Sequence, residues 1–214
     1  MLRASHTSAF HLADSLLTLE PETTQPRDLR SRYGRVVASL ERLLSAVETQ
    51  AVVAGGWAVW RHGFAGRVTQ DIDIVVAREA LDSVLNAAAF AGFEKLEIRP
   101  GRWPKLVHKE TGIEVDLMPE GGIPGIPSNL GPTPIAHPIS YGAELSQLRY
   151  ITLAGLFELK LGSYRAKDRA DIVELLKQNW DHQLELTRSL STIHPILATR
   201  FAECVQEAKN EEET

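Results

Sequence analysis

The 214-residue sequence lacks the features of several classes of protein. Cys204 is its one cysteine, which excludes an internal disulfide and a zinc site built from cysteine ligands. No apolar run approaches the roughly 20 residues that a membrane-spanning helix requires. Basic residues are outnumbered, since 23 Lys and Arg against 28 Asp and Glu leave a formal net charge of −5. This charge argues against a protein dedicated to duplex nucleic acid. We expect a cytoplasmic protein with no membrane partner.

The first 27 residues carry no clear periodicity. The stretch between Pro21 and Pro26 is polar and suits a linker, and Asp14 and Glu20 interrupt the apolar residues that a secretory signal would need. We therefore expect residues 1–27 to form a poorly specified leader, whose role the sequence leaves open.

Residues 28–147 have the pattern of a mixed α/β unit. Apolar residues recur at helical spacing from Leu29 to about Glu48, and short apolar or β-branched runs typical of buried strands follow. The expected strands are Ala51–Ala54, Ile72–Val76, 93–98, Lys105–His108 and Ile113–Met118, and the expected helices are Trp57 to about His62 and Ala80–Phe90, which Gly92 ends. The Pro- and Gly-rich stretch Pro119–Pro138 predicts a long surface loop.

From residue 148 to 214 the pattern becomes helical. Thr152 is expected to cap a helix that runs to about Ser163, and Asp168 to cap a second helix with Asp171 at its third position. Two further helices are expected near Leu184–Leu190 and Pro195–Ala208. The predicted fold class is α/β (α+β): a small mixed sheet with flanking helices, followed by a C-terminal helical region packed on this core.

Two carboxylates lie two residues apart in the run Asp71-Ile72-Asp73-Ile74. On a strand, residues i and i+2 point to the same face and lie roughly 6–7 Å apart. Ile72 and Ile74 would then face the core and both aspartates would face outward. A divalent cation would offset their repulsion, and Mg²⁺ prefers carboxylate and phosphate oxygens. The plain alternative is a solvated strand face.

A second acidic run, Glu114-Val115-Asp116-Leu117, has the same alternation. If its strand lies beside the first, a third carboxylate joins the pair. Three carboxylates on one sheet face can form a two-metal site, which aligns an attacking hydroxyl and a leaving pyrophosphate around one phosphorus. Glu114 and Asp116 compete for this third position.

Gly55-Gly56 lies between an expected strand and an expected helix. Glycines at such a junction leave backbone N–H groups bare enough to face a phosphate. The plain alternative is a tight turn. Together with the acidic runs downstream, the pair favours a nucleotide site over a solvated strand face.

The order of these motifs resembles the DNA polymerase β-like nucleotidyltransferase superfamily. Gly55-Gly56-Trp57-Ala58, Arg67-Val68-Thr69-Gln70-Asp71-Ile72-Asp73 and a later acidic strand are similar to its bacterial toxin-like branch, which includes the AbiEii-type and MenT toxins. Leu156-Phe157-Glu158-Leu159-Lys160 and the stretch Arg165–Ile172 are similar to that branch's lysine helix and following acidic stretch. The resemblance covers about residues 51–178.

This resemblance implies a metal site. Asp71 and Asp73 would hold Mg²⁺, with Mn²⁺ as the alternative ion, and Asp116 would complete the site and help to remove the acceptor's proton. Asp116 is preferred to Glu114 because it sits between apolar neighbours in the family's manner. The 14 residues between Gly56 and Asp71 make a slightly longer connection than the superfamily's.

The resemblance also implies a nucleotide site. Gly55 and Gly56 would cradle the triphosphate, and Arg67 and Thr69 would support its phosphate end. Lys160, a catalytic candidate, would reach the triphosphate or the base. Two further residues, Lys167 and Asp168, would accompany Asp171 at the edge of the same cleft, where Asp171 joins the nucleotide-binding set.

The implied activity is transfer of an NMP group from an NTP to an acceptor hydroxyl, with release of pyrophosphate. For the toxin-like branch the implied acceptor is tRNA and the implied partner is a cognate antitoxin protein. The alternatives are an antibiotic-type small molecule or a protein as acceptor, or a nucleotide-binding module without catalysis. The sequence does not distinguish among the nucleotides.

Overall fold

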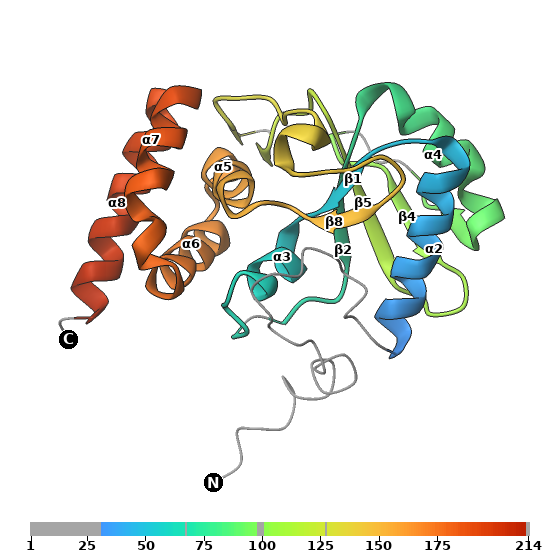
Figure 1. Ribbon diagram of the computed structural model, residues 1–214, viewed down its shortest axis with the longest axis horizontal. Coiled ribbons are helices and arrows are strands. Elements are labelled where there is room, and N and C mark those ends of the chain that lie inside the picture. The colour runs from blue at the N-terminus through green and yellow to red at the C-terminus, as the bar shows by residue number, and fades with distance from the viewer. Residues whose placement is uncertain (1–30, 67, 98–100, 127, 213–214) are drawn as a thin grey trace, which may run out of the picture.

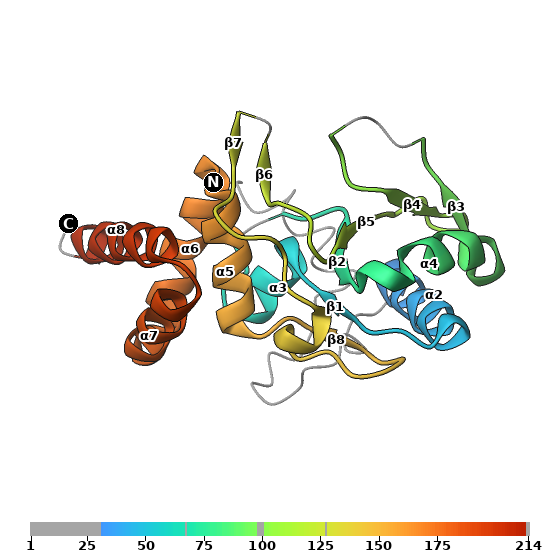
Figure 2. The same cartoon turned by 90° about the horizontal axis from the view of Figure 1, so that it is seen from above.

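The computed structural model describes residues 31–66, 68–97, 101–126 and 128–212 of the chain. Its centre is a six-stranded sheet. Helices α2 (Ser31–Val47) and α4 (Leu81–Ala87) lie on one side of the sheet, and the C-terminal helices lie beyond its opposite end (Figures 1 and 2). The predicted mixed α/β class, a small mixed sheet with flanking helices followed by C-terminal helices, is confirmed.

The elements follow the predicted order closely. The sheet strands are β1 (Ala51–Val53), β2 (Ile72–Val76), β3 (Phe93–Lys95), β4 (Lys105–His108), β5 (Glu114–Pro119) and β8 (Leu148–Tyr150). The helices are α2 (Ser31–Val47), α3 (Gly55–Arg61), α4 (Leu81–Ala87), α5 (Leu153–Ser163), α6 (Ala166–Gln178), α7 (Gln183–Ile193) and α8 (Pro195–Glu212). Short 3-10 turns are η2 (Arg78–Ala80), η3 (Ala88–Ala91), η4 (Pro138–Tyr141) and η5 (Trp180–His182).

The sheet has the order β3-β4-β5-β2-β1-β8. The β2–β5 and β1–β8 pairs are parallel, and the β1–β2, β3–β4 and β4–β5 pairs are antiparallel. The parallel pairing of β2 with β5 brings together two strands that are about 40 residues apart in the sequence. This pairing decides which acidic residues become neighbours.

Alternation along β2 and β5 separates a buried face from an open one. Ile72, Ile74, Val115 and Leu117 are completely buried in the core, as the period-2 pattern predicts. Helices α2 and α4 pack against each other on one side of the sheet, and the small strands β6 (Gly125–Ile126) and β7 (Asn129–Leu130) lie on the other side (Figure 2). The residues between the buried ones therefore face the side on which β6 and β7 lie.

The four C-terminal helices pack on one another at the β1–β8 end of the sheet (Figure 1). Thr152 caps α5 as predicted, because its hydroxyl accepts a hydrogen bond from the Gly155 amide at 3.2 Å. Helix α5 also contacts α3, which joins the helical group to the strands. Among the described residues, no helix combines the length and the apolar character needed to cross a membrane.

Three local predictions are wrong. Residues 148–150, which were expected to belong to the helical region, form the edge strand β8. The stretch predicted as a plain loop contains the hairpin β6 (Gly125–Ile126) and β7 (Asn129–Leu130), whose two-residue strands are too short to give an alternating pattern. Asp168 does not cap α6: the cap is Arg165, and Asp168 lies in the first turn. Its carboxylate accepts the Arg165 backbone N–H at 3.2 Å, which stabilises the helix start from inside.

Candidate active site

Two of the predicted carboxylates meet on the open face of the sheet. Asp73 on β2 and Asp116 on β5 are register partners across the parallel pair, and both side chains are half-buried. Asp71 lies immediately before β2, whose first strand residue is Ile72. The adjacent strands thus supply two acidic positions side by side and a third one residue before β2.

Lys105 is a charged neighbour of this group that the sequence analysis did not assign to it. It is the register partner of Asp116 on β4, and its ammonium lies 2.9 Å from Asp116 Oδ1 and 2.8 Å from Glu114 Oε2. Counting outward from the turn between β4 and β5 would have placed Lys105 opposite Asp116, so the signal was present in the sequence.

The environment of Asp116 fits a cation-binding role. Burial raises the pKa of its carboxyl above the ordinary value, and although Lys105 opposes this shift, Asp71 and Glu114 add to it. Acidic side chains that share one face and repel one another suit a divalent cation, and carboxylate oxygens are the donors that Mg²⁺ prefers. The carboxylate oxygens of Asp71, Asp73 and Asp116 do not all lie within 4.8 Å of one another.

The two glycines are held against these residues by close packing. Gly55 has a φ of +60°, and a Cβ atom there would lie only 1.7 Å from Asp73 Oδ2. A Cβ atom on Gly56 would lie 2.6 Å from the Thr69 hydroxyl. The sequence therefore requires glycine at the β1–α3 junction because the chain passes directly beside the Asp73 carboxylate.

Thr69 lies next to the acidic group and has a local partner. It is buried, and its hydroxyl lies 3.4 Å from both the backbone oxygen and Oδ1 of Asp71. Tyr33 Oη donates to the Gln70 backbone oxygen at 3.3 Å and so fixes the same segment from α2. These contacts support the position of Asp71. Arg67, which was predicted to support the phosphate end, lies outside the described residues.

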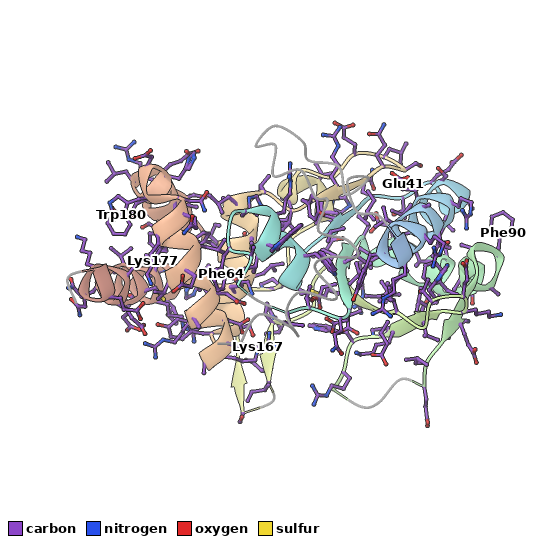
Figure 3. The ribbon with its side chains drawn as sticks, turned by 90° about the horizontal axis from the view of Figure 1, so that it is seen from below. Glu41, Phe64, Phe90, Lys167, Lys177 and Trp180 are labelled. Carbon is purple, nitrogen blue, oxygen red and sulfur yellow. The ribbon has the colours of Figure 1, made fainter. Side chains whose placement is uncertain are left out.

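Lys160 and Asp171 come together, but in a buried ion pair. Lys160 Nζ lies 2.6 Å from Asp171 Oδ2 and 3.6 Å from Asp168 Oδ1, and the lysine side chain is only 6% exposed. Lys167, by contrast, is exposed near the start of α6, close to the β6–β7 hairpin (Figure 3). Lys160 and Asp171 thus lie beneath the surface at the α5–α6 junction, whereas Lys167 lies on it.

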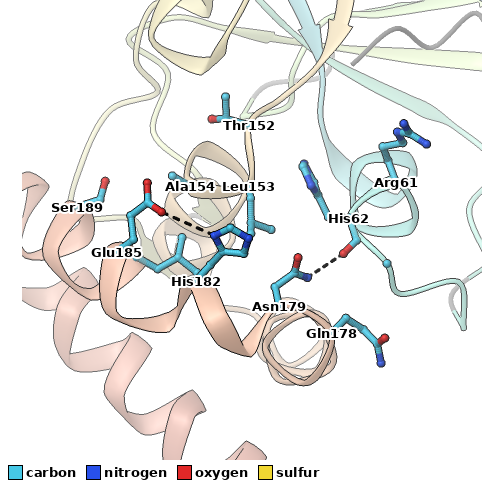
Figure 4. A pocket seen from close by; sticks show the side chains of 12 residues that line it. Arg61, His62, Thr152, Leu153, Ala154, Gln178, Asn179, His182, Glu185 and Ser189 are labelled. Atoms are coloured by element: carbon cyan, nitrogen blue, oxygen red, sulfur yellow. Dashed lines mark hydrogen bonds and ion pairs between the residues drawn. The ribbon is translucent and has the colours of Figure 1, made fainter. Parts of the chain in front are cut away.

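A cavity of about 590 Å³ lies elsewhere, between the end of α3, the start of α5 and the α6–α7 connection (Figure 4). Its lining includes Arg61, His62, Asn179, His182 and Glu185. Burial lowers the pKa of His62, whose Nε2 lies 2.8 Å from the Ile151 backbone oxygen. None of the predicted site residues lines this cavity, so it is distinct from the acidic group.

Another acidic and histidine group, Glu79, Glu120 and His137, has ligand atoms within 4.8 Å of one another. The sequence offers no spacing that would have revealed it. His137 Nδ1 accepts a hydrogen bond from the Ile139 amide at 3.2 Å, so Nε2 carries the proton in neutral imidazole. That Nε2 lies 3.8 Å from Glu79 Oε1, which is longer than a hydrogen bond.

The geometry distinguishes the two candidates for the third carboxylate. The Asp116 side chain is 17% exposed and aligned with Asp73, whereas the Glu114 side chain is 47% exposed and belongs to the first residue of β5. We expect Asp116→Asn to lower the transfer rate by about a hundredfold or more, as loss of a charge-stabilising group does. Glu114→Gln should change it less than about threefold, since it alters only an exposed ion pair. Initial rates of the two variants, compared at equal folded concentration, test this; a larger loss in Glu114→Gln would contradict it.

One comparison with known proteins, a match to a family model, agrees with part of this interpretation. Residues 36–122 match the family model described as aminoglycoside-2''-adenylyltransferase. A search of curated proteins finds no match. One similar solved structure is the crystal structure of ANT(2'')-Ia in complex with adenylyl-2''-tobramycin, with 12% identity over 80% of this chain and 96% of that chain and a TM-score of 0.40.

The matched segment contains the β1–α3 glycines and the strands that carry Asp73 and Asp116. The match supports the predicted enzyme class, a nucleotidyltransferase. It gives no support to the AbiEii or MenT toxin-like branch, nor to tRNA or an antitoxin as partners. It ends before α5, so it does not bear on Lys160 or Asp171.

Proposed function

We propose that the chain is a Mg²⁺-dependent nucleotidyltransferase that transfers an NMP group to a hydroxyl of a small, polyhydroxylated and cationic acceptor of the aminoglycoside class. The observation that carries the proposal is the register of Asp73 with Asp116 on parallel neighbouring strands, inside the segment that matches an adenylyltransferase family. The net charge of −5 favours a cationic acceptor over an RNA.

The proposed chemistry assigns separate roles to the residues on the open face. Asp71, Asp73 and Asp116 would hold the metal ion, which supplies charge neutralisation on the phosphate oxygens. Gly55 and Gly56 let the backbone approach the phosphates beside Asp73. The acceptor oxygen forms a bond to the α-phosphorus while the bond from that phosphorus to the bridging oxygen breaks. Pyrophosphate leaves, and Asp116 takes the hydroxyl proton. Catalysis thus relies on positioning and charge stabilisation.

An RNA acceptor, which the toxin-like resemblance implies, would require a basic surface that could neutralise several phosphates. The acidic balance of the chain does not favour this hypothesis. The hypotheses of a protein acceptor and of a module that binds nucleotide without turnover rest on the same acidic group. The molecule that receives a labelled NMP group distinguishes these hypotheses from the small-molecule proposal.

The test is transfer of label from each α-³²P NTP, with Mg²⁺, to three acceptor pools: an aminoglycoside panel, total RNA and a protein extract. We expect label on an aminoglycoside, lost when EDTA removes the metal. Label in RNA or protein instead would overturn the small-molecule proposal and keep the enzyme class. Nucleotide binding without any label would support the non-catalytic module.

A further inference from the structure

A group of four charged residues joins the end of α5 to the start of α6. Lys160 pairs with Asp171 at 2.6 Å and lies 3.6 Å from Asp168. Asp168 also accepts from Arg165, whose Nε lies 2.7 Å from Oδ2 and whose Nη2 lies 3.2 Å from Oδ1. The two cations and two carboxylates balance in charge, but they differ sharply in exposure.

Lys160 is poorly placed to touch a ligand. Its side chain is 6% exposed, and its ammonium is directed at two carboxylates that are themselves buried. To reach a triphosphate it would have to break its 2.6 Å ion pair with the buried Asp171 carboxylate, which is costly. Lys160 therefore suits a structural position within the charged group.

Arg165 presents its charge outward. Its side chain is 43% exposed, and only Nε and Nη2 donate to Asp168. Among the residues that the structure describes, Nη1 has no hydrogen-bond partner. A guanidinium fixed on one edge and open on the other matches the geometry of phosphate oxygens, which arginine binds through paired N–H groups.

The backbone around Arg165 is held firmly. Tyr164 adopts a left-handed conformation with a φ of +46° at the end of α5, which turns the chain sharply into α6. Tyr164 Oη donates to Glu203 Oε2 at 2.5 Å, and Arg200 Nη1 donates to the Leu161 backbone oxygen at 2.6 Å. Contacts from α8 thus support the unusual turn and fix the direction in which Arg165 leaves it.

The junction lies on the same side of the sheet as the acidic group. The end of α5 packs against the β6–β7 hairpin, since a Cβ atom on Gly131 would lie 2.9 Å from the Gly162 backbone oxygen. These two strands lie on the open side of the sheet (Figure 2). Burial lowers the pKa of Arg165, but Asp168 outweighs this effect, and Asp73 and Asp171 raise the pKa further. The charge of Asp73 thus acts on the pKa of Arg165 in the same direction as the charges of Asp168 and Asp171, which agrees with the place of the junction on the open side.

We propose that Arg165 contacts the phosphate groups of the nucleotide, and that Lys160 is a positioning residue that holds Asp168 and, through it, the Arg165 guanidinium. This assignment rests on the proposed nucleotidyltransferase function for its substrate. It changes the role expected for Lys160 and adds a phosphate-binding residue outside the segment that matches the adenylyltransferase family.

The test measures binding of Mg²⁺–tripolyphosphate to the full chain by calorimetry. Arg165→Ala should weaken binding by at least about tenfold, the loss expected for a charge-assisted contact, and Arg165→Lys should restore part of it. Arg169→Ala is the matched control, because Arg169 lies one turn further along α6 and pairs with Glu207 on α8 at 2.9 Å. It should bind as the unchanged protein does, and thermal unfolding should show every variant folded.

Equal affinities in Arg165→Ala and Arg169→Ala would overturn the assignment, as would a failure of the unchanged protein to bind tripolyphosphate. The KM for the NTP should rise by the same factor as the dissociation constant. Label transfer by the unchanged protein with no effect of Arg165→Ala would refute this inference alone. Arg165-dependent phosphate binding without any transfer would refute the proposed function alone.

Discussion

Replacing Asp73 with asparagine is expected to lower the transfer rate about a thousandfold or more while leaving the fold intact. Asp73 lies at the centre of the acidic group, opposite Asp116 and directly beside Gly55. Asparagine keeps the size of the side chain but removes the charge that would hold a divalent cation. Such an ion contributes several kcal/mol of charge stabilisation in the transition state, which corresponds to a rate factor of this order.

Initial rates at saturating nucleotide and Mg²⁺, with thermal unfolding measured in parallel, provide the check. Asp82→Asn is the control, since Asp82 is an exposed carboxylate in the first turn of α4. It should keep the full rate. A folded Asp73→Asn protein with the rate of the unchanged protein would refute the assignment of Asp73 to the metal site.

Asp168→Asn is expected to cause the largest loss of stability, about 3–5 kcal/mol in the free energy of unfolding. The Asp168 carboxylate is 2% exposed and accepts from Ser163 Oγ at 2.8 Å and from Arg165, with Lys160 nearby. Removing its charge leaves the buried Lys160 with one partner fewer. Urea denaturation at pH 7 measures the loss, and the exposed Asp181→Asn control should stay within about 0.5 kcal/mol of the unchanged protein.

The stability difference should also depend on pH. Burial alone would raise the pKa of Asp168, but Arg165, Lys160 and Ser163 outweigh it and the net direction is downward. A carboxyl with a lowered pKa stabilises the fold above its unfolded value of about 3.9, and this contribution is lost as pH falls through the folded value. The gap between the unchanged protein and Asp168→Asn should be constant from pH 7 to about 4 and shrink below that. A gap that widens on acidification would contradict this electrostatic origin of the stability loss.

The acidic candidates illustrate how far local pattern predicts a site. The i, i+2 alternation correctly placed Asp73 and Asp116 on the open face of the sheet and their apolar neighbours on the fully buried face. The same reasoning missed Lys105, although the short β4–β5 turn fixes it opposite Asp116. The ion pair between Lys105 and Asp116 could thus have been predicted from the sequence by counting the register of the β4–β5 hairpin.

Lys160 shows that a local pattern does not predict the burial of a side chain. Its place on α5 was predicted correctly, yet nothing in the sequence around it shows that its ammonium is buried between Asp168 and Asp171. Burial depends on α6 folding back over α5, and that depends on the turn at Tyr164, which contacts from α8 support. The exposed partner in this group, Arg165, becomes recognisable only when these helices are packed.

The sequence by itself determined the order and kind of the longer elements, the capping of α5 by Thr152 and the open side of the strands, because each of these depends on residues a few positions apart. It did not determine the short strands β6, β7 and β8. Only the tertiary structure decided that β2 lies parallel to β5, so that Asp73 meets Asp116, and that Arg165 presents its charge where Lys160 does not. The physical reason is that strand pairing and helix packing are selected by burial of apolar surface between segments distant in the chain, and no local periodicity records which segments will meet.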